Sequence, residues 1–487
     1  MTLLSKILEN IRFKFVQGNL ETQVNEIQID SRKVQKGNLF VAIKGTENDG
    51  HQYIPQVIEK GASVIVCENI PNGIPSEVTV IQVDNAGILA GILASNFYDN
   101  PSSKLKVVAV TGTNGKTTTA TLLYELFRKL GYAVGLFSTV VNKINGDEIP
   151  TNLTTPDAIT IQKLMAEMVK KKCSFVFMEA SSHAIVQGRL SGLQIKGAIF
   201  TNITHDHLDY HKTFQNYINA KKLLFDGLSE NAFALVNLDD KRGQVMLQNC
   251  KAKHYTFALK TMADFQAKII HNSFDGLHLN INGKEAWFRL IGDFNAYNLL
   301  GIYATAVLLG ENPEEVLRAM SELRPAVGRF EQMISPNMVR GIVDYAHTPD
   351  ALQNVLETIL KIKKSSQKVI TVVGCGGNRD ATKRPIMAKI AAQMSDKVIL
   401  TSDNPRNEDP EEILRQMELG LDDLEKKKSV KIVDRREAIK YAVQLAHQQD
   451  IILLAGKGHE TYQEIKGVKH HFDDKEELSK AFESDKI

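Results

Sequence analysis

The chain has 487 residues, of which 43% are hydrophobic and 24% are charged, as in ordinary soluble globular proteins. Its length exceeds what one hydrophobic core normally supports, so we expect three domains. Lysine and arginine number 59 against 57 aspartates and glutamates, a formal charge of +2, which excludes a whole-chain field that would recruit nucleic acid or an acidic membrane. We therefore expect small-molecule substrates, no nucleic-acid partner and no membrane partner, and take a monomer as the default state.

The sequence carries no sign of export or membrane insertion. Its four cysteines are scattered and form no Cys-x-x-Cys pair, which predicts neither a disulfide framework nor a cysteine zinc site. Lys6 and Glu9 interrupt the apolar character of the first residues, so we expect an amphipathic helix there and not a signal peptide. Because no run of about 18 or more apolar residues occurs, a cytoplasmic protein is expected.

Two polar interruptions predict the domain boundaries. Residues 99–104 contain a proline and two serines directly before an apolar run, which is typical of a linker. Near residues 325–338, prolines, a glycine and an asparagine interrupt regular structure. We predict three domains, at residues 1–100, 101–330 and 331–487, of which the first is a small α/β domain.

Short apolar runs alternate with helical stretches in the second and third domains. In chain order, the second domain has an apolar run at 105–110, a helix from about Lys116, and further runs at 174–178 and 197–200. The third has runs at 368–373, 397–400 and 450–455, separated by helical stretches. This alternation predicts βαβ units. The expected fold class is α/β, with a central, mostly parallel P-loop sheet and a C-terminal Rossmann-like α/β domain.

A phosphate-binding loop follows the run at 105–110, with the sequence Val-Thr-Gly-Thr-Asn-Gly-Lys-Thr-Thr-Thr. Gly112 and Gly115 allow backbone N–H groups to converge on phosphate oxygens, Lys116 neutralises phosphate charge, and Thr117 can reach Mg²⁺. The strict motif would have glycine where this sequence has Val110. A polar turn at a helix start is the alternative, but the preceding strand and the Lys-Thr pair favour nucleotide binding. The ATP-binding residues predicted in this loop are Gly112, Thr113, Asn114, Gly115, Lys116, Thr117 and Thr118.

Further motifs occur along the chain. They are Asp-Ser-Arg at 30–32, Asp-Gly-His at 49–51, Met-Glu-Ala-Ser-Ser-His at 178–183, Asp-His-Leu-Asp-Tyr-His at 206–211, Phe-Asn-Ala-Tyr-Asn at 294–298, Asp-Tyr-Ala-His-Thr-Pro at 344–349 and Gly-Lys-Gly-His-Glu at 456–460. Together with the variant loop, they resemble the Mur ligase family of ATP-dependent amino-acid and peptide ligases, which includes folylpolyglutamate synthetase. The resemblance covers essentially the whole chain. The motifs at 30–32 and 49–51 resemble a nucleotide-sugar domain, which disfavours folylpolyglutamate synthesis.

The resemblance implies a ligase of peptidoglycan-precursor synthesis. ATP would phosphorylate the free side-chain carboxylate of D-glutamate in UDP-N-acetylmuramoyl-L-alanyl-D-glutamate (UDP-MurNAc-L-Ala-D-Glu). The amine of an incoming amino acid would then attack the acyl phosphate and release phosphate. By the same resemblance, residues 1–100 would bind the UDP-sugar, residues 101–330 would bind ATP, and residues 331–487 would bind the amino acid.

Catalytic and metal-binding roles also come from the resemblance. The implied catalytic residues are Lys116, Glu179, His207 and Lys221, and the implied Mg²⁺ ligands are Thr117, Glu179, His207 and Lys221. Lys221 would act as a carbamate formed with CO₂, which turns a cation into an anion that can bind a metal. From the residues alone, Lys221 is a solvated helix lysine and Lys222 offers an alternative register. The ATP-binding residues implied outside the loop are Asn298, Arg329, Asp344 and His347, of which Asn298 and Asp344 could equally be caps or turn residues.

The identity of the incoming amino acid depends on an arginine. meso-2,6-Diaminopimelate carries a distal carboxylate that L-lysine lacks, and a guanidinium can bind it in a bidentate manner. Residues 403–406, Asp-Asn-Pro-Arg, follow the run at 397–400 and resemble the signature of diaminopimelate-adding family members. A helix-entry turn, with a helix starting at Glu408, is the local alternative, and L-lysine is the alternative substrate. The expected amino-acid-binding residues are Arg379, Asp403, Asn404, Pro405, Arg406, Gly456 and Glu460.

By the resemblance, a third set of residues matches family contacts to the UDP-MurNAc-dipeptide. Their hydroxyls and guanidinium suit diphosphate and carboxylate groups. These residues are Ser31, Thr154, Thr155, Ser181, Gln187 and Arg189. Ser182 is an alternative to Ser181.

Two other functional classes compete with the ligase. Residues 205–209, His-Asp-His-Leu-Asp, resemble the start of a dinuclear metallo-hydrolase motif, but Tyr210 stands where that motif requires histidine. A hydrolase would also leave the phosphate-binding loop without a purpose. The second alternative is a regulatory module that binds ATP without ligation, and amino-acid-dependent ADP release separates it from a ligase.

Overall fold

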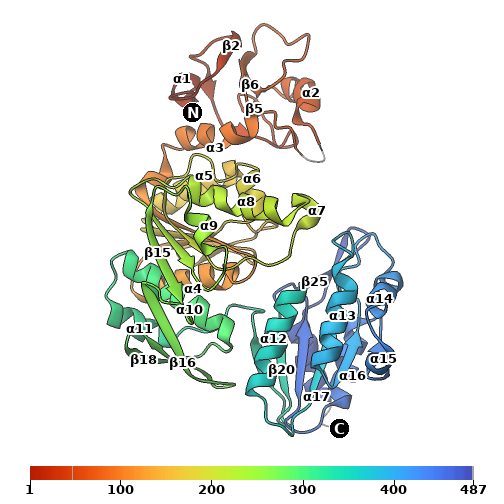
Figure 1. Ribbon diagram of the computed structural model, residues 1–487. Helices are drawn as coiled ribbons and strands as arrows, with labels where there is room; N and C mark the ends of the chain where they lie inside the picture. The colour runs from red at the N-terminus through yellow and green to blue at the C-terminus, as the bar shows by residue number, and fades with distance from the viewer. Residues whose placement is uncertain (46–47, 485–487) are drawn as a thin grey trace.

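The computed structural model describes residues 1–45 and 48–484. Figure 1 shows that the chain builds a small N-terminal unit, a central unit and a C-terminal unit in sequence order, each around its own sheet. Helices pack against the sheets of the N-terminal and central units, and in the C-terminal unit helices cover both faces of the sheet. Within the described residues, no helix is long and apolar enough to cross a membrane. The expected α/β fold class is confirmed.

The N-terminal unit contains a five-stranded sheet of order β2-β7-β6-β5-β4, in which β4 to β7 run parallel and β2 is antiparallel. Its elements are β1 (Thr2–Leu3), α1 (Leu4–Ile7), β2 (Lys14–Gln17), β3 (Gln23–Val24), β4 (Ile27–Gln28), β5 (Leu39–Val41), the 3₁₀ helix η1 (Gly50–Tyr53), α2 (Ile54–Glu59), β6 (Val64–Cys67), β7 (Thr79–Gln82), α3 (Ala86–Phe97) and the 3₁₀ helix η2 (Pro101–Lys104). The amphipathic helix expected from the first residue onward is wrong in extent. Only Leu4–Ile7 is helical, because Thr2–Leu3 pairs with Gln23–Val24 as a strand.

The central unit contains an eleven-stranded sheet of order β11-β10-β9-β12-β8-β13-β14-β15-β16-β17-β18. Its elements are β8 (Lys106–Thr111), α4 (Lys116–Lys129), β9 (Val134–Phe137), β10 (Asn142–Ile144), β11 (Asp147–Ile149), α5 (Ala158–Lys170), β12 (Phe175–Glu179), α6 (Ser182–Val186), β13 (Ile195–Phe200), α7 (Leu208–His211), α8 (Phe214–Asp226), β14 (Phe233–Asn237), α9 (Gly243–Leu247), β15 (Lys253–Ala258), β16 (Phe265–Ser273), β17 (Gly276–Ile281), β18 (Lys284–Phe288), α10 (Asp293–Leu308) and α11 (Pro313–Ser321). The strands from β9 to β16 along this order run parallel. The mostly parallel sheet expected from the alternating runs is therefore present.

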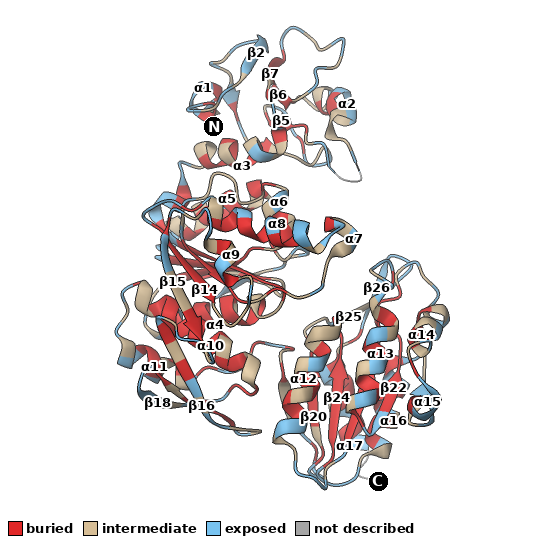
Figure 2. Ribbon diagram, viewed as in Figure 1, coloured by how far each residue is buried: buried red, intermediate tan, exposed pale blue. Residues whose placement is uncertain are grey.

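Strand β8 lies in the middle of this sheet and divides its side chains between two cores. Val108 and Val110 pack in one core with residues of α4 and α10. Val107 and Ala109 pack in the other with residues of α5 and α8. Because successive strand residues point to opposite faces, a continuous apolar run is what a strand covered on both sides requires. Figure 2 shows the resulting band of buried residues along the central strands. This packing holds the end of β8 and the following loop in a fixed position.

The C-terminal unit contains a six-stranded sheet of order β19-β20-β24-β21-β22-β23, parallel except for β19. Its elements are β19 (Glu331–Ile334), β20 (Arg340–Asp344), α12 (Pro349–Ile362), β21 (Val369–Val373), α13 (Lys383–Met394), β22 (Lys397–Leu400), α14 (Pro410–Glu418), α15 (Asp423–Lys427), β23 (Ser429–Lys431), α16 (Arg435–Leu445), β24 (Ile451–Ala455), β25 (Tyr462–Ile465), β26 (Val468–His471) and α17 (Asp474–Ser484). The helix expected to start at Glu408 begins at Pro410, because Asp409 caps it by accepting a hydrogen bond from the Glu411 N–H.

A buried ion pair joins the last helix, α17, to helix α16. The Arg435 guanidinium donates to both carboxylate oxygens of Asp474, at 2.7 and 2.6 Å, and both side chains are fully buried. Asp474→Ala leaves the guanidinium buried without a counter-charge, so we expect it to destabilise the unit by about 3–5 kcal/mol in urea denaturation. The matched control is Glu476→Ala in the same helix, whose exposed carboxylate should contribute less than about 0.5 kcal/mol. Equal effects of the two substitutions would contradict the structural role of the buried pair.

Candidate active site

A cavity of about 710 Å³ lies between the central and C-terminal units and collects most of the residues singled out in the sequence. The sequence-predicted residues that line it are Thr113, Asn114, Gly115, Lys116, Thr117, Thr118, Thr154, Thr155, Glu179, Ser181, Arg189, His207, Lys221, Arg329, Asp344, His347, Arg379, Asp403, Asn404, Arg406, Gly456 and Glu460. The residues that do not line it are Ser31, Gly112, Gln187, Asn298 and Pro405. The site is thus built at the carboxyl ends of the parallel strands of two sheets, where α/β folds bind ligands.

The phosphate-binding loop joins β8 to α4. Gly112 and Gly115 have positive φ angles of 152° and 86°. A Cβ at Gly112 would collide with the Thr201 hydroxyl, and one at Gly115 would lie 2.6 Å from the Asn298 amide oxygen. Glycine is therefore required at both positions. Asn298 packs against the outside of the loop, which explains why this predicted ATP contact is absent from the cavity wall.

Lys116 begins α4 and folds back over the loop. Its ammonium donates to the carbonyl oxygens of Gly112 and Thr113, at 2.9 and 2.8 Å. Burial lowers the pKa of Lys116, which means that its charge is poorly solvated. A cation held in this way at the N-terminus of a helix is suited to bind phosphate oxygens.

Glu179 lies next to this loop, at the end of the neighbouring strand. Strand β12 pairs in parallel with β8 and places Glu179 opposite Val110. The carboxylate is fully buried. One of its oxygens accepts hydrogen bonds from the Thr139 N–H and hydroxyl, at 2.7 and 3.0 Å, and the other accepts from the Thr117 hydroxyl at 2.9 Å. Thr117 and Glu179 thus form a pair of hard oxygen donors beside the loop, the ligand type that Mg²⁺ prefers.

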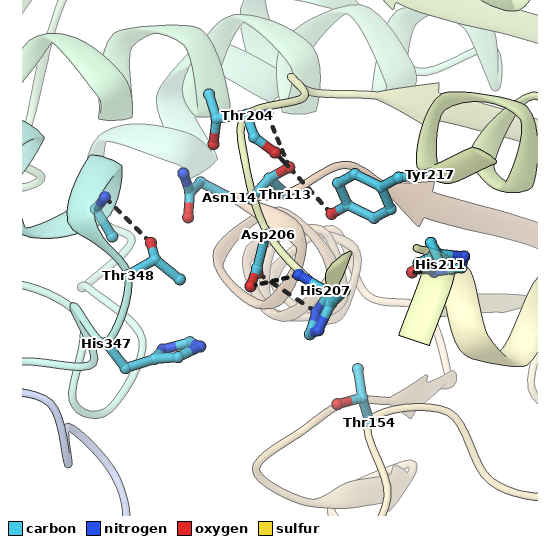
Figure 3. A network of polar contacts seen from close by, with 12 residues as sticks. Thr113, Asn114, Thr154, Thr204, Asp206, His207, His211, Tyr217, His347 and Thr348 are labelled. Atoms are coloured by element: carbon cyan, nitrogen blue, oxygen red, sulfur yellow. Dashed lines mark hydrogen bonds and ion pairs between the residues drawn. The ribbon is translucent and has the colours of Figure 1, made fainter. Parts of the chain in front are cut away.

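His207 approaches the same space from the loop after β13. Its ring nitrogen lies 3.4 Å from the Asp206 carboxylate. Figure 3 shows both side chains extending toward the space that His347 approaches from the C-terminal unit and Thr154 from another side. Burial lowers the pKa of His207 to about 3, so its imidazole is neutral and has a lone pair for a ligand. Among the described residues, no group of three or more His, Cys, Asp and Glu side chains is placed to hold a metal by itself.

Lys221 on α8 is the most unusual cation of the cavity. Only 1% of this residue is exposed. Its ammonium donates to the Gly112 carbonyl at 2.8 Å and lies 4.4 Å from the centre of the Tyr217 ring. Burial and the nearby Lys116 lower the pKa of Lys221 well below its ordinary value. The ordinary expectation of a solvated helix lysine is wrong here, whereas Lys222, the alternative register, pairs with Asp226 and is absent from the cavity wall.

The C-terminal unit and the segment that leads into it contribute charged and aromatic groups on the opposite side of the loop. The Arg329 guanidinium donates to the Thr117 hydroxyl at 3.1 Å and lies over the Tyr345 ring. Asp344, at the end of β20, accepts a hydrogen bond from the Phe330 N–H, and burial raises its pKa to about 6. Burial lowers the pKa of His347 to about 4, which keeps it neutral at pH 7. Arg329, in the segment between α11 and β19, is thus a cation that reaches the phosphate-binding loop from beyond the central sheet.

The far end of the cavity is formed by residues 403–406 and 456–460. Arg406 donates to the Gly377 carbonyl at 2.8 Å and lies 3.4 Å from the Glu464 carboxylate. The Asn404 amide donates to Glu460 at 2.7 Å. Asp403 lines the cavity near this pair, and Pro405 turns the chain between Asn404 and Arg406 without lining the cavity. Arg406 and the carboxylates of Asp403 and Glu460 therefore face the same space, which suits a ligand end that carries both an ammonium and a carboxylate.

The side of the cavity toward the N-terminal unit carries hydroxyls and a guanidinium. The Thr155 hydroxyl donates to the Glu179 carbonyl at 2.7 Å, and Arg189 donates to the Thr155 carbonyl at 2.8 Å. Gln187 holds the Arg189 guanidinium through its side-chain oxygen, at 2.6 and 3.0 Å, and so acts behind the wall. Ser181 caps α6 by accepting from the Ala184 N–H. Ser31 lies in the N-terminal unit, outside this cavity.

Several cavity residues were not predicted from the sequence. Asp206 and His459 lie within the motifs at 206–211 and 456–460, so these motifs were the signal that could have identified them. Ser182, the alternative to Ser181, also lines the cavity, and its hydroxyl lies 2.9 Å from His211. Thr139, which binds Glu179, follows an ordinary strand end and has no distinguishing sequence pattern. Its role becomes visible only once β9 pairs with β12.

Comparisons with known proteins agree with this geometry. Family models described as Mur ligase family, catalytic domain, Mur ligase middle domain, and Mur ligase, glutamate ligase domain match residues 23–98, 110–306 and 328–458. A protein of Cytophaga hutchinsonii named UDP-N-acetylmuramoyl-L-alanyl-D-glutamate–2,6-diaminopimelate ligase is 60% identical, over 94% of this chain and 95% of its own length. A solved structure with that title is 32% identical, covers 100% of both chains and has a TM-score of 0.70.

A second solved structure, MurF ligase from Thermotoga maritima in complex with ADP, shares the fold at 19% identity, with a TM-score of 0.65 over 95% of this chain and 98% of its own. The identity over nearly the full chain establishes the family independently of that fold similarity. The chain belongs to the Mur ligase family, the ATP-dependent ligases of peptidoglycan-precursor synthesis.

Proposed function

We propose that this protein joins meso-2,6-diaminopimelate to the D-glutamyl side-chain carboxylate of UDP-MurNAc-L-Ala-D-Glu, with cleavage of ATP to ADP and phosphate. One observation carries the proposal: a single cavity holds the phosphate-binding Lys116 at one end and Arg406 with two carboxylates at the other. The relative named for this reaction is 60% identical over nearly the full chain. A cavity of this kind can hold the acyl phosphate and the attacking amine next to each other.

The three units divide the substrates between them in this proposal. Residues 1–100 bind the UDP-sugar, and Ser31 contacts it there. Residues 101–330 bind ATP, and residues 331–487 bind the amino acid. The dipeptide end of the UDP substrate lies along Thr154, Thr155 and Arg189, with its glutamyl carboxylate directed toward the phosphate-binding loop. Limited proteolysis that cuts near residues 99–104 and 325–338 before other positions would support these boundaries.

The first chemical step transfers the γ-phosphoryl group of ATP to the glutamyl carboxylate, so that a carboxylate oxygen bonds to phosphorus and the bond to ADP breaks. Backbone N–H groups at the start of α4 and the Lys116 ammonium hold the phosphate oxygens. Arg329, which already bonds to the Thr117 hydroxyl, adds positive charge from the segment between α11 and β19. These fixed donors stabilise the charge of the transferring group without reorganising during the reaction.

Magnesium is the ion that this donor set fits, and the fit rests on the oxygen pair of Thr117 and Glu179. We propose that Thr117, Glu179, His207 and carbamylated Lys221 hold Mg²⁺ together with ATP oxygens. Bound there, the ion would neutralise phosphate charge. His207 is kept neutral by its surroundings and so can present a ring nitrogen.

The second step is attack of the diaminopimelate amine on the acyl phosphate carbon, with departure of phosphate and loss of a proton from the amine. In this proposal Arg406 binds the distal carboxylate of diaminopimelate, and Asp403 and Glu460 bind the neighbouring ammonium. Arg379, at the same end of the cavity, provides a second cation. The residues of the C-terminal unit thus fix one end of the amino acid and leave the other amine directed at the acyl phosphate.

The enclosed position of Lys221 beside the phosphate-binding loop supports its proposed carbamylation. The ammonium is enclosed, and the only hydrogen bond recorded for it in the described residues goes to the Gly112 carbonyl. We expect Lys221→Arg to lose at least about 100-fold in turnover, because a guanidinium keeps the charge but does not form the carbamate. Protein equilibrated with ¹³C-bicarbonate should give a carbamate signal by NMR that Lys221→Arg lacks and Lys222→Arg retains. A signal that persists in Lys221→Arg would place the carbamate elsewhere.

ADP release tests the proposed reaction. With ATP, Mg²⁺ and UDP-MurNAc-L-Ala-D-Glu present, meso-diaminopimelate should stimulate ADP release, whereas omission of either co-substrate should abolish the stimulation. No stimulation by any amino acid would contradict the ligase and favour a regulatory ATP-binding module. Greater stimulation by L-lysine would retain the ligase and overturn the choice of amino acid.

A further inference from the structure

Lys457 is a buried cation for which the proposed reaction assigns no role. Its side chain is fully buried. The neighbouring Gly456 and the nearby Glu460 line the cavity, whereas Lys457 lies behind the cavity wall. A lysine is almost never completely buried unless its charge is paired. Its position therefore requires an electrostatic explanation.

The contacts of Lys457 join three segments of the amino-acid end of the cavity. Its ammonium lies 3.7 Å from an Asp403 carboxylate oxygen and 3.5 Å from a Glu460 carboxylate oxygen. It also donates to the Tyr462 carbonyl, at the start of β25, and to the Asn404 side-chain oxygen at 3.5 Å. The two carboxylates that face the ligand space therefore share one ammonium from behind.

The two carboxylates are not fully satisfied by this arrangement. The Asp403 oxygen nearest to Lys457 is buried and accepts no hydrogen bond from the described residues. Glu460 accepts one from the Asn404 amide, and burial together with the Asp403 charge raises the pKa of Glu460. Two carboxylates and one ammonium leave one negative charge in excess, directed at the cavity.

Two arginines near this group each have an acidic partner of their own. Arg435 donates to the carbonyl of Ala455, just before Gly456, but Asp474 neutralises its guanidinium. Arg406 lies 3.4 Å from the Glu464 carboxylate. Among the described residues, Lys457 is the cation paired directly with the Asp403 and Glu460 carboxylates, so it sets the net charge of this pair.

We propose that Lys457 determines amino-acid specificity from behind the cavity wall, by limiting the excess negative charge of the Asp403 and Glu460 carboxylates to one. This inference rests on the proposed function. The distal end of diaminopimelate carries an ammonium and a carboxylate, so one excess negative charge matches the ammonium and Arg406 matches the carboxylate. The distal end of L-lysine carries an ammonium alone. Without the Lys457 charge, the site would attract a bare ammonium more strongly and repel the carboxylate.

Lys457→Gln tests this, because glutamine can still donate to the Tyr462 carbonyl while the charge is removed. We expect the ratio of kcat/KM for meso-diaminopimelate to kcat/KM for L-lysine to fall about tenfold or more, with KM for ATP unchanged. Lys457→Arg, which keeps the charge, should keep the preference. Lys428→Met, which removes a lysine bonded to the Ser395 carbonyl in the same unit, should leave the ratio unchanged.

A purely structural role of Lys457 predicts a different outcome, in which Lys457→Gln lowers kcat/KM for both amino acids equally. An unchanged ratio of the two kcat/KM values, with or without a loss of activity, would overturn the proposal. If Lys457→Gln fails to fold, the test uses two other variants, the single variant Asp403→Asn and the double variant Asp403→Asn with Lys457→Gln. The double variant should discriminate less against L-lysine than the single variant does. The wild-type assay separates the two claims, because failure of the wild type to use diaminopimelate would contradict the proposed function itself.

Discussion

Lys116→Ala is expected to reduce amino-acid-dependent ADP release by about 100- to 1000-fold, because one fixed cation at the transferring phosphoryl group is lost. The ammonium bonds only to carbonyl oxygens of its own loop, so its removal breaks no bond to another element among those described. Steady-state ADP release under saturating amino acid measures the effect. We expect the main loss in kcat, since negative charge develops on the leaving ADP oxygen in the transition state.

The control for this substitution is Lys129→Ala, at the other end of the same helix. Lys129 is partly exposed and pairs with Glu322, so its removal should change ADP release by less than about twofold. If Lys116→Ala retains wild-type turnover, the phosphate-binding role of the loop is contradicted. Equal losses in both variants would indicate damage to α4 instead of a lost phosphate contact.

Arg406→Ala is expected to lower kcat/KM for meso-diaminopimelate by about 100-fold, because the distal carboxylate loses its guanidinium partner. Activity with L-lysine, which has no such carboxylate, should stay within about threefold. The substitution should therefore reduce the ratio of kcat/KM for meso-diaminopimelate to kcat/KM for L-lysine. Parallel measurements of ADP release with each amino acid give the ratio directly.

The backbone conformation of Arg406 calls for a second variant that tolerates the same φ angle. Its φ of 52° lies in the left-handed region, which alanine adopts less readily than asparagine. Arg406→Asn therefore removes the guanidinium while it retains the backbone preference. We expect the same selective loss in both variants. A loss in Arg406→Ala alone would assign the effect to the backbone, and unchanged discrimination in both would contradict the carboxylate-binding role.

The sequence predicts the strands and the loop well because their signals are local. The apolar run before the phosphate-binding loop forms β8, and the run at 397–400 forms β22 with the same bounds. Arg406 and Asp403 could be assigned to one site because they stand in one short motif. Where the chain departs from local rules, as at Thr2–Leu3, a distant strand supplies the partner that changes the structure.

The environment of single side chains is less accessible to sequence. Lys221 has the spacing of an ordinary helix lysine, and its enclosure depends on the Gly112 carbonyl, 109 residues away. The pairing of Arg406 with Glu464, and of Lys457 with Asp403, joins segments that the fold alone brings together. These contacts decide charge balance at the site, and they follow from tertiary packing that no local pattern encodes.

A competition reaction tests the central claim most directly. Enzyme is supplied with ATP, Mg²⁺, UDP-MurNAc-L-Ala-D-Glu and equal concentrations of meso-diaminopimelate and L-lysine, and the products are identified by mass. The proposed function predicts the diaminopimelate-containing tripeptide as the dominant product, formed with one ADP for each peptide bond. A dominant L-lysine product, or ADP formed without any new peptide bond, would contradict it.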